Sequence, residues 1–207
     1  MSIVLYHHPY SRAANVVWML EELAVPYELA FVDILAGAQH SPAHLARNHM
    51  GKLPVLEDGD ATVSETAAIG LYLADRYGLG TLAPTLDDPA RGAYLQWAVY
   101  GPSVVEPGCM AHASKWEYKP GQAGWGSYDR MLDTLQEALA PGPFLLGERF
   151  TMADMLLGGT LRWMLQFKMI EDRPGFQAYA DRLGARPAAQ VAQRKNAEIA
   201  AAHGLGR

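Results

Sequence analysis

The spacing of apolar residues changes near residue 80, and this change constrains the fold more than any other feature of the chain. Before it, strand-like and helix-like patterns alternate, and after it every periodic stretch is helix-like. Sheets and helices bury apolar side chains with different periods, so the two parts need different architectures. The sequence therefore predicts a small α/β domain followed by an all-helical domain.

The first part is predicted to fold in the order βαβαββα. Asp58-Gly59-Asp60 between two apolar runs is typical of a hairpin turn. Ser41 before Pro42 is typical of a helix start, with Ser as the cap and Pro in the first turn. Strands are expected at 2–7, 27–32, 53–57 and 61–64, and helices at 12–25, 41–48 and 65–77.

A segment without periodicity, Gly80–Pro89, separates the two parts. We expect domains at 1–79 and 89–207, joined by a linker at 80–88. Thr151 and Asp154 have the spacing of a capping box, and Gly101-Pro102 and Pro107-Gly108 should kink or interrupt the first helix of the second domain. Helices are expected there at 90–110, 127–140, 151–169, 175–183 and 187–203.

Charge and composition exclude several classes of protein. The net charge is −5 and no basic patch indicates a nucleic-acid partner. The longest stretch without Asp, Glu, Lys or Arg has 14 residues, at 92–105, whereas a membrane span needs about 18 or more. A strand-like run from residue 2 leaves no room for a signal peptide, and the single cysteine, Cys109, fits a reducing compartment. We therefore expect a cytoplasmic protein without a membrane partner, and the histidine spacing predicts no metal site.

The turn after the first strand carries the first candidate site. Ser11 lies where a buried strand meets a helix start, and helix N-termini stabilise anions such as a thiolate. The Ser11 hydroxyl could donate a hydrogen bond to that thiolate without acting as a base or a nucleophile. The alternative is that Ser11 only caps the helix, as serine commonly does.

Three further groups of residues likewise have one functional and one structural interpretation. Pro54 begins a strand of the edge type, where its missing N–H would face outward. A cis bond there would turn neighbouring backbone groups outward to pair with an extended peptide, whereas an ordinary trans proline would not. Glu65 and Thr66 open a helix after a strand, where they could bind a ligand's ammonium and carboxylate groups or simply suit the helix dipole. His40 and Lys52 could meet a carboxylate or be solvated surface residues.

Aromatic residues gather in the segment 113–126, among Pro and Gly. Trp116 and Trp125 would form an apolar binding surface if they are exposed on a loop. Burial against the helices is the alternative.

Four segments together are similar to one known family. They are P-x-S-R-A…V-x-W-x-L-E-E-L…P-Y-E (Pro9–Glu28), G-K-L-P-V-L (Gly51–Leu56), S-E-T-A-A-I (Ser64–Ile69) and F-T-M-A-D (Phe150–Asp154). In this order, before a helical half, they make the chain resemble the glutathione transferase superfamily, in particular its theta-like and bacterial serine-type classes. The resemblance implies a thioredoxin-like N-terminal domain followed by an all-helical bundle.

The resemblance also implies roles for individual residues. Ser11 matches the serine that activates the thiol of glutathione, the cosubstrate, although a hydroxyl of Tyr10 or Tyr6 could take this role. Leu53-Pro54 matches the family's structural cis-proline bond. Glutathione-binding residues would be His40, Lys52, Leu53, Val55, Glu65 and Thr66, and a pocket for an apolar electrophile between the domains would include Tyr10, Tyr100 and Trp116.

The resemblance predicts a homodimeric glutathione transferase, which acts in detoxification by attack of a glutathione thiolate on an apolar electrophile. One alternative is a non-catalytic glutathione- or partner-binding module of the same fold. Another is a glutathione-dependent peroxidase or ether-cleaving activity, which would use the same thiolate. The loop 9–12 contains no cysteine, and this argues against glutaredoxin-like chemistry.

Overall fold

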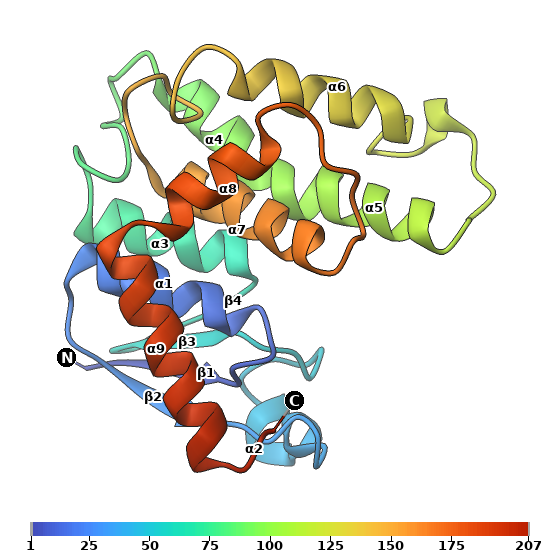
Figure 1. The fold of residues 1–207 in the computed structure, drawn as a ribbon. Coiled ribbons are helices and arrows are strands. Elements are labelled where there is room, and N and C mark those ends of the chain that lie inside the picture. Colours follow the sequence, from blue (N-terminus) through green and yellow to red (C-terminus); the bar gives the residue numbers. More distant parts are fainter. Residues whose placement is uncertain (1, 207) are drawn as a thin grey trace. The chain divides into compact units, whose positions relative to one another are not determined.

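The computed structural model describes residues 2–206 of the chain. Contacts divide these residues into two compact units, which Figure 1 colours along the sequence. The first unit runs up to Gly78 and includes the segment from Arg186 onward, and the second unit is Leu79–Ala185. Within the described residues, none of the helices combines the length and the apolar character that crossing a membrane requires.

The first unit is built on a four-stranded mixed sheet in the order β2-β1-β3-β4. The strand β1 (Ile3–His7) is parallel to β2 (Tyr27–Phe31) and antiparallel to β3 (Val55–Asp58). A hairpin joins β3 to β4 (Ala61–Ser64), as the Asp-Gly-Asp turn predicts. This is the predicted α/β architecture.

Helices cover both faces of this sheet (Figure 1). The helices α1 (Ala13–Leu23) and α3 (Thr66–Tyr77) pack against each other on one side, where alternate residues of β1 are buried. The short helix α2 (Pro42–Leu45) follows a 3₁₀ turn at Ala38–His40 and lies on the other side, where His44 meets the ring of Tyr6. Ser41 caps α2 by accepting a hydrogen bond from the amide of His44 at 3.3 Å.

The helix α9 (Pro187–Ala202) packs against α1 within the first unit (Figure 1). Polar contacts fix its position: Lys195 forms an ion pair with Glu21 of α1, and Asn196 accepts a 2.6 Å hydrogen bond from the ring of His7. This segment is predicted to belong to a helical domain at 89–207, whereas its contacts group it with the sheet. Hydrophobic periodicity identifies a helix but not its packing partner, and this is why the two divisions differ.

The second unit is helical, and α7 (Met152–Gln166) lies at its centre. It packs against α4 (Arg91–Tyr100) and α8 (Phe176–Gly184), and most of its residues are buried. The predicted capping box at its start is confirmed, because the Asp154 carboxylate accepts the amide of Thr151 at 2.8 Å. The helical bundle expected after residue 89 is therefore present.

The predicted interruption of the helix at 90–110 takes the form of a π-helical segment, Gly101–Val105, between α4 and α5 (Glu106–Ala113). Here the chain passes close to α7: a Cβ at position 101 would lie 2.9 Å from Oγ1 of Thr160. Glycine permits this close approach, and the wider π turn accommodates Pro102 without a break in the helix.

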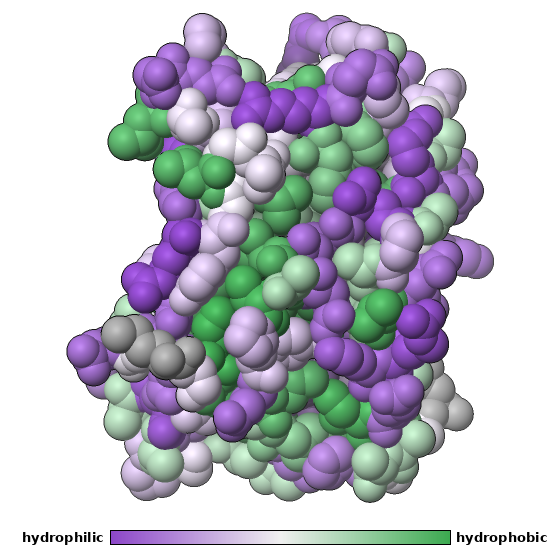
Figure 2. All heavy atoms as spheres, turned by 90° about the vertical axis from the view of Figure 1, so that its left-hand side faces the viewer, coloured by the Kyte–Doolittle hydropathy of each residue, from purple (hydrophilic) through white to green (hydrophobic). Residues whose placement is uncertain are grey.

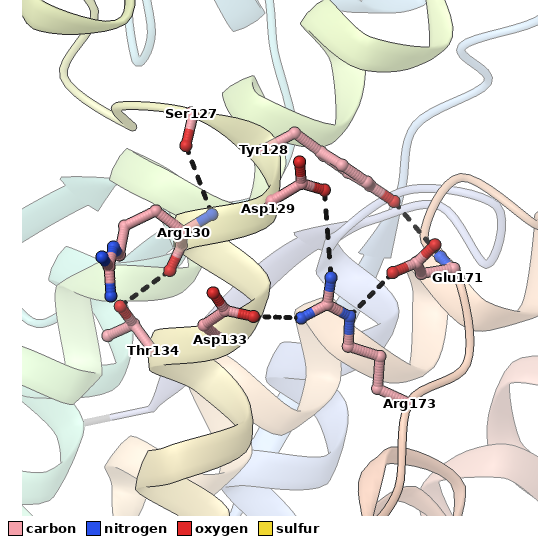
Figure 3. Close-up of polar contacts among 8 residues, drawn as sticks. All are labelled: Ser127, Tyr128, Asp129, Arg130, Asp133, Thr134, Glu171 and Arg173. Carbon is pink, nitrogen blue, oxygen red and sulfur yellow. Dashed lines mark hydrogen bonds and ion pairs between the residues drawn. The ribbon is translucent and has the colours of Figure 1, made fainter.

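A charged cluster connects α6 (Tyr128–Leu139) to the segment between α7 and α8 (Figure 3). The guanidinium group of Arg173 donates hydrogen bonds to Asp133 at 2.5 Å and to Glu171 at 2.7 Å. The amide of Glu171 donates to the hydroxyl of Tyr128 at 3.2 Å. The ion pair between Arg173 and Asp133 thus attaches this connecting segment to α6.

The surface of the protein is mixed. In Figure 2, hydrophilic side chains cover much of one face, and apolar side chains are exposed in patches among them. Large apolar residues with substantial exposure include Leu35, Met50, Leu79, Leu86 and Trp116.

Candidate functional site at one end of the sheet

Strand pairing brings three predicted site segments to the same end of the sheet. Tyr6 of β1 pairs with Val55 of β3, and Val55 pairs with Ser64 of β4. Because β3 runs antiparallel to both neighbours, the end of β1, the start of β3 and the end of β4 lie side by side. Adjacent strands are about 4.8 Å apart, so the segments that follow or precede this row are within reach of one small ligand.

Ser11 lies in the turn after β1, just before α1 begins at Ala13. Its hydroxyl donates a hydrogen bond to the carbonyl oxygen of His8 at 2.8 Å and accepts one from the amide of Ala13 at 3.2 Å. The second contact resembles a helix cap, and it also places the hydroxyl at the positive end of α1. The geometry is therefore compatible with both interpretations of Ser11.

The two tyrosines that could replace Ser11 are engaged elsewhere. The hydroxyl of Tyr10 donates to the carbonyl oxygen of Leu205 at 2.5 Å, and the hydroxyl of Tyr6 donates to Glu57 at 2.9 Å. Burial, and then the adjacent Glu57 carboxylate, raise the pKa of Tyr6. A raised pKa disfavours the phenolate form. Of the three candidate hydroxyls, that of Ser11 accepts a hydrogen bond from the first residue of α1, whereas those of Tyr6 and Tyr10 donate to Glu57 and Leu205.

The segment before β3 contains a cis peptide bond between Leu53 and Pro54, the isomer that the resemblance implies. Two side chains hold the preceding residue: the ring of His44 and the amide of Asn48 contact the carbonyl oxygen of Lys52 at 3.1 and 3.2 Å. Both side chains are almost fully buried. The backbone conformation before β3 is therefore fixed from the α2 side.

The position of Val55 in the sheet differs from the prediction. Pro54 is predicted to begin an edge-type strand, whereas β3 lies inside the sheet, with β1 and β4 on its two sides. The backbone groups of Val55 face one of these neighbours, which leaves Leu53, outside the ladder, as the better candidate to pair with an extended ligand. Hydrophobic alternation does not determine strand order, so the internal position of β3 could not be predicted from the sequence.

Glu65 lies between β4 and α3 with an unusual backbone conformation, φ 70° and ψ 123°. This region is costly for any residue other than glycine, typically by about 1–3 kcal/mol, and such strain is concentrated at functional sites. The Glu65 side chain is exposed and makes no cap to α3, and Thr66 begins that helix. Capping alone therefore does not account for Glu65.

His40 and Lys52 are both exposed. His40 lies close to the loop that carries Lys52, because a Cβ at Gly51 would lie 2.7 Å from its Nδ1 atom. Gly51 has a φ of 59°, which also favours glycine. The two predicted carboxylate ligands thus belong to neighbouring surface segments of the same unit.

Comparison with known proteins identifies the family. Residues 1–75 match the family described as glutathione S-transferase, N-terminal domain, and residues 119–182 match glutathione S-transferase, C-terminal domain. A curated relative, glutathione S-transferase F14 of Arabidopsis thaliana, is 30% identical over 83% of this chain and 75% of its own length. The chain belongs to the glutathione S-transferase family.

Solved structures of the glutathione S-transferase family have the same fold. A glutathione S-transferase from Actinobacillus pleuropneumoniae is 29% identical, with a TM-score of 0.78 and coverage of 94% of this chain and 92% of that chain. A glutathione transferase homologue from Sulfitobacter, solved with bound glutathione, is 26% identical, with a TM-score of 0.75 and coverage of 94% and 98%. Members of this family are enzymes that use glutathione as cosubstrate, and the N-terminal unit has the expected thioredoxin-like fold.

The residues predicted to bind the electrophile belong to different units of this transferase. Tyr10 is in the first unit, and Tyr100 and Trp116 are in the second. Tyr100, at the end of α4, packs edge-on against Trp97, and burial raises its pKa. Trp116 is 56% exposed in the segment after α5. The electrophile pocket stays a prediction.

Three residues that support the site are not predicted from the sequence. His44 and Asn48 hold Lys52, and His8 accepts a hydrogen bond from the amide of Tyr10 at 3.1 Å. Buried polar side chains need hydrogen-bond partners, so a buried His or Asn beside a candidate loop indicates that it holds the loop. The sequence does not show which polar side chains are buried, and so it does not indicate this role. No group of metal-ligating side chains was found among the residues that the structure describes.

Proposed function

We propose that this glutathione S-transferase binds glutathione at the shared end of β1, β3 and β4 and activates its thiol as a thiolate at Ser11. The pairing row Tyr6–Val55–Ser64 supports the proposal most strongly, because it gathers the Ser11 turn, the cis Leu53–Pro54 bond and the start of α3. Glutathione is an extended tripeptide with a charged group at each end, and this row of segments suits its length.

The residues of the site match the chemical groups of glutathione. The backbone of Leu53 would pair with the cysteinyl unit, which directs the thiol toward Ser11. Glu65 and Thr66 would hold the ammonium and carboxylate of the γ-glutamyl end at the start of α3. His40 and Lys52 would hold the glycyl carboxylate. The roles of Glu65, Thr66, His40 and Lys52 follow the resemblance, and the role of Leu53 follows from its place just before β3, at the shared end of the sheet.

Ser11 would stabilise the thiolate by rotation of its hydroxyl. In the present structure the hydroxyl donates to the carbonyl oxygen of His8, and turning toward the sulfur replaces this neutral hydrogen bond with a charge-assisted one. The amide of Ser11 also donates to the His8 carbonyl oxygen at 3.0 Å, so that the oxygen keeps a partner after the change. The start of α1 favours the negative charge on the sulfur.

The thiolate would then attack an apolar electrophile, held near Tyr10, Tyr100 and Trp116. Proximity and the increased thiolate population would supply most of the rate. A homodimeric state, a cytoplasmic location and a role in detoxification are further expectations from the resemblance.

Substitution of Ser11 tests the proposal. We expect Ser11→Ala to bind glutathione but to reduce turnover of an aryl-halide electrophile at neutral pH by about 10- to 100-fold, because a charge-assisted hydrogen bond contributes about 1.5–3 kcal/mol. Ser11→Thr should retain much of the activity. The exposed Ser103 gives a matched control, Ser103→Ala. Calorimetry with glutathione and the ultraviolet absorbance of the bound thiolate against pH separate binding from ionisation.

The alternatives predict different results. Activity that survives Ser11→Ala and is lost with Tyr10→Phe would show that the assignment of Ser11 is wrong. Binding of glutathione without turnover of aryl halides, peroxides or ethers would favour a non-catalytic module. Turnover of a hydroperoxide or an ether alone would be consistent with the thiolate mechanism, but it would show that the substrate is not the proposed apolar electrophile.

A further inference from the structure

Tyr10 is held at both ends. Its backbone amide donates a hydrogen bond to Nδ1 of His8 at 3.1 Å, and its hydroxyl donates to the carbonyl oxygen of Leu205 at 2.5 Å. The second contact joins residues 195 positions apart in the sequence. Tyr10 precedes Ser11 directly, so these contacts fix the turn that presents the Ser11 hydroxyl.

His8 holds the inner side of this turn. Its side chain is fully buried, and its ring packs against the rings of Tyr10 and Phe31 at centroid distances of 5.6 and 5.4 Å. Because Nδ1 accepts the Tyr10 amide, the ring proton is on Nε2. The carbonyl oxygen of His8 also accepts the amide and the hydroxyl of Ser11. His8 therefore binds both residues of the turn.

The chain after α9 holds the outer side. We define the α9 turn as His203–Leu205. Gly204 has a φ of 63°, and the amides of Gly204 and Leu205 donate to the carbonyl oxygens of Ala201 and Ala200 at 3.1 and 2.8 Å. This pattern is a Schellman motif, which reverses the chain at the end of a helix.

The α9 turn is also attached to the sheet. The ring of His203 stacks on Phe31, the last residue of β2, with a centroid distance of 3.6 Å and an angle of 8°. Phe31 in turn packs against His8. The reversal at Gly204 and this stack together direct the Leu205 carbonyl oxygen toward the hydroxyl of Tyr10.

We propose that His8 and the α9 turn form a two-sided clamp on Tyr10, and that the clamp positions the Ser11 hydroxyl for thiol activation. His8 and Leu205 are positioning residues, since they act through the turn. The catalytic consequence rests on the proposed role of Ser11, whereas the clamp itself is a property of the ligand-free protein. Opening the clamp would let the turn sample several conformations, and few of these present the hydroxyl to the sulfur.

Substitution of Gly204 tests the outer side without touching the proposed binding residues. A Cβ at this position meets no atom within 4 Å, so a substitution acts through the backbone alone. A β-branched residue strongly disfavours positive φ, whereas asparagine tolerates it. Gly204→Val should therefore release the α9 turn, and Gly204→Asn, the matched control, should retain it.

The first measurement is amide hydrogen exchange at Tyr10 and Ser11 in the ligand-free protein. We expect exchange about tenfold faster in Gly204→Val than in Gly204→Asn. In a Tyr10→Phe background, where no hydroxyl binds Leu205, Gly204→Val should add little. Equal exchange rates in Gly204→Val and Gly204→Asn would show that the α9 turn does not hold Tyr10. The same conclusion would follow if the effects of Gly204→Val and Tyr10→Phe on the exchange rate were fully additive.

Substitution of His8 tests the inner side. Within the part of the chain that the structure describes, Nε2 of His8 has no hydrogen-bond partner, so a replacement needs only an acceptor near Nδ1. His8→Asn supplies this acceptor and His8→Leu does not. We expect His8→Leu to accelerate exchange of the Tyr10 amide and His8→Asn to restore slow exchange. The same rate in both variants would reject the role of His8.

The second measurement is the ionisation of bound glutathione, followed by the ultraviolet absorbance of the thiolate against pH. Gly204→Val should raise the pKa of the bound thiol and lower kcat, with little change in KM for glutathione, relative to Gly204→Asn. A purely structural role would change the unfolding midpoint and leave the thiol pKa unmoved, and this result would reject the catalytic link. If Ser11→Ala leaves activity intact, the proposed function fails, while the exchange experiment still decides whether the clamp exists.

Discussion

Arg186 binds Glu22 with two parallel hydrogen bonds, from Nε at 2.6 Å and from a terminal nitrogen at 2.9 Å. The Glu22 side chain is only 9% exposed, and it also accepts a hydrogen bond from the indole of Trp18 at 2.9 Å. Arg186 immediately precedes α9 and Glu22 lies near the end of α1. This pair connects residues 164 positions apart and fixes where α9 starts on the first unit.

Arg186→Lys should loosen α9. A lysine ammonium cannot reproduce both hydrogen bonds of the planar guanidinium group, so we expect the free energy of unfolding to fall by about 1–2 kcal/mol. Urea denaturation followed by circular dichroism measures this change. Arg194→Lys, on the exposed side of the same helix, is the control and should change stability little. The prediction fails if the two variants unfold at the same urea concentration.

His7 should make the protein less stable in mild acid. Burial lowers the pKa of His7 from 6.5 to about 4. Between these values the unfolded chain binds a proton that the folded chain does not, so stability falls as pH decreases from about 6.5 to 4, by an amount on the order of 3 kcal/mol. His8, whose pKa is also lowered by burial, adds an effect of the same sign.

His7→Gln tests this pH dependence, because a glutamine amide can still donate to Asn196 but does not titrate. Urea midpoints of the native protein should decrease from pH 7 to 4.5, and those of His7→Gln should decrease less. His49→Gln, at an exposed position of the same unit, is the control. Identical slopes for the native protein and His7→Gln would contradict the prediction.

Replacement of Asp154 by asparagine, which has the same shape, should destabilise the protein. One carboxylate oxygen accepts the amide of Leu145 and the hydroxyl of Tyr179, and the other accepts the amide and hydroxyl of Thr151. Asparagine offers one acceptor oxygen, so its NH₂ group would face donors on one side. We expect Asp154→Asn to lower the free energy of unfolding by about 3 kcal/mol or more.

Tyr179→Phe removes only one donor to Asp154 and should cost about 1–2 kcal/mol. Thermal unfolding ranks the variants, with exposed Asp172→Asn as a control. A larger loss for Tyr179→Phe than for Asp154→Asn would show that ring packing, rather than the hydrogen bonds, dominates at this position.

Substitution of Glu65 by glycine should weaken glutathione binding without lowering the stability of the protein. Its φ of 70° suits glycine, so Glu65→Gly relieves the backbone strain, although the flexibility of glycine in the unfolded chain offsets part of this gain. We expect the free energy of unfolding to stay equal or rise by up to about 1 kcal/mol. Glutathione affinity should fall by at least about tenfold, since a charged hydrogen bond is lost.

Glu65→Gln retains the strained backbone and removes only the charge. Calorimetry with glutathione, alongside urea denaturation, compares the two variants. A loss of stability in Glu65→Gly without a loss of affinity would indicate that Glu65 acts in folding rather than in binding.

Local chemistry made several features predictable. The turn at Asp58-Gly59-Asp60, the cap at Ser41 and the capping box at Thr151 and Asp154 all depend on residues within one turn of each other. The cis bond before Pro54 followed only from the resemblance, since the residues alone left trans open. Ser11 was identified as a helix-start hydroxyl, but both of its roles stayed compatible with that position.

Other features depend on contacts between distant segments. The side chains of His8, His44 and Asn48 appear ordinary in the sequence, and burial beside the site loops gives them their function. The position of β3 inside the sheet, which removes Val55 from an edge, comes from pairing with β1 and β4. Spacing within one strand carries no information on its neighbours.

The order of the strands and longer helices, and the family motifs, could be predicted from the sequence, because periodicity, caps and turns depend on neighbouring residues. Which of these elements pack together depends on the tertiary structure. The burial of His7 against Asn196 and the contact of Tyr10 with Leu205 place α9 beside the candidate site. These contacts are selected by the packing of the whole unit, which no local pattern records.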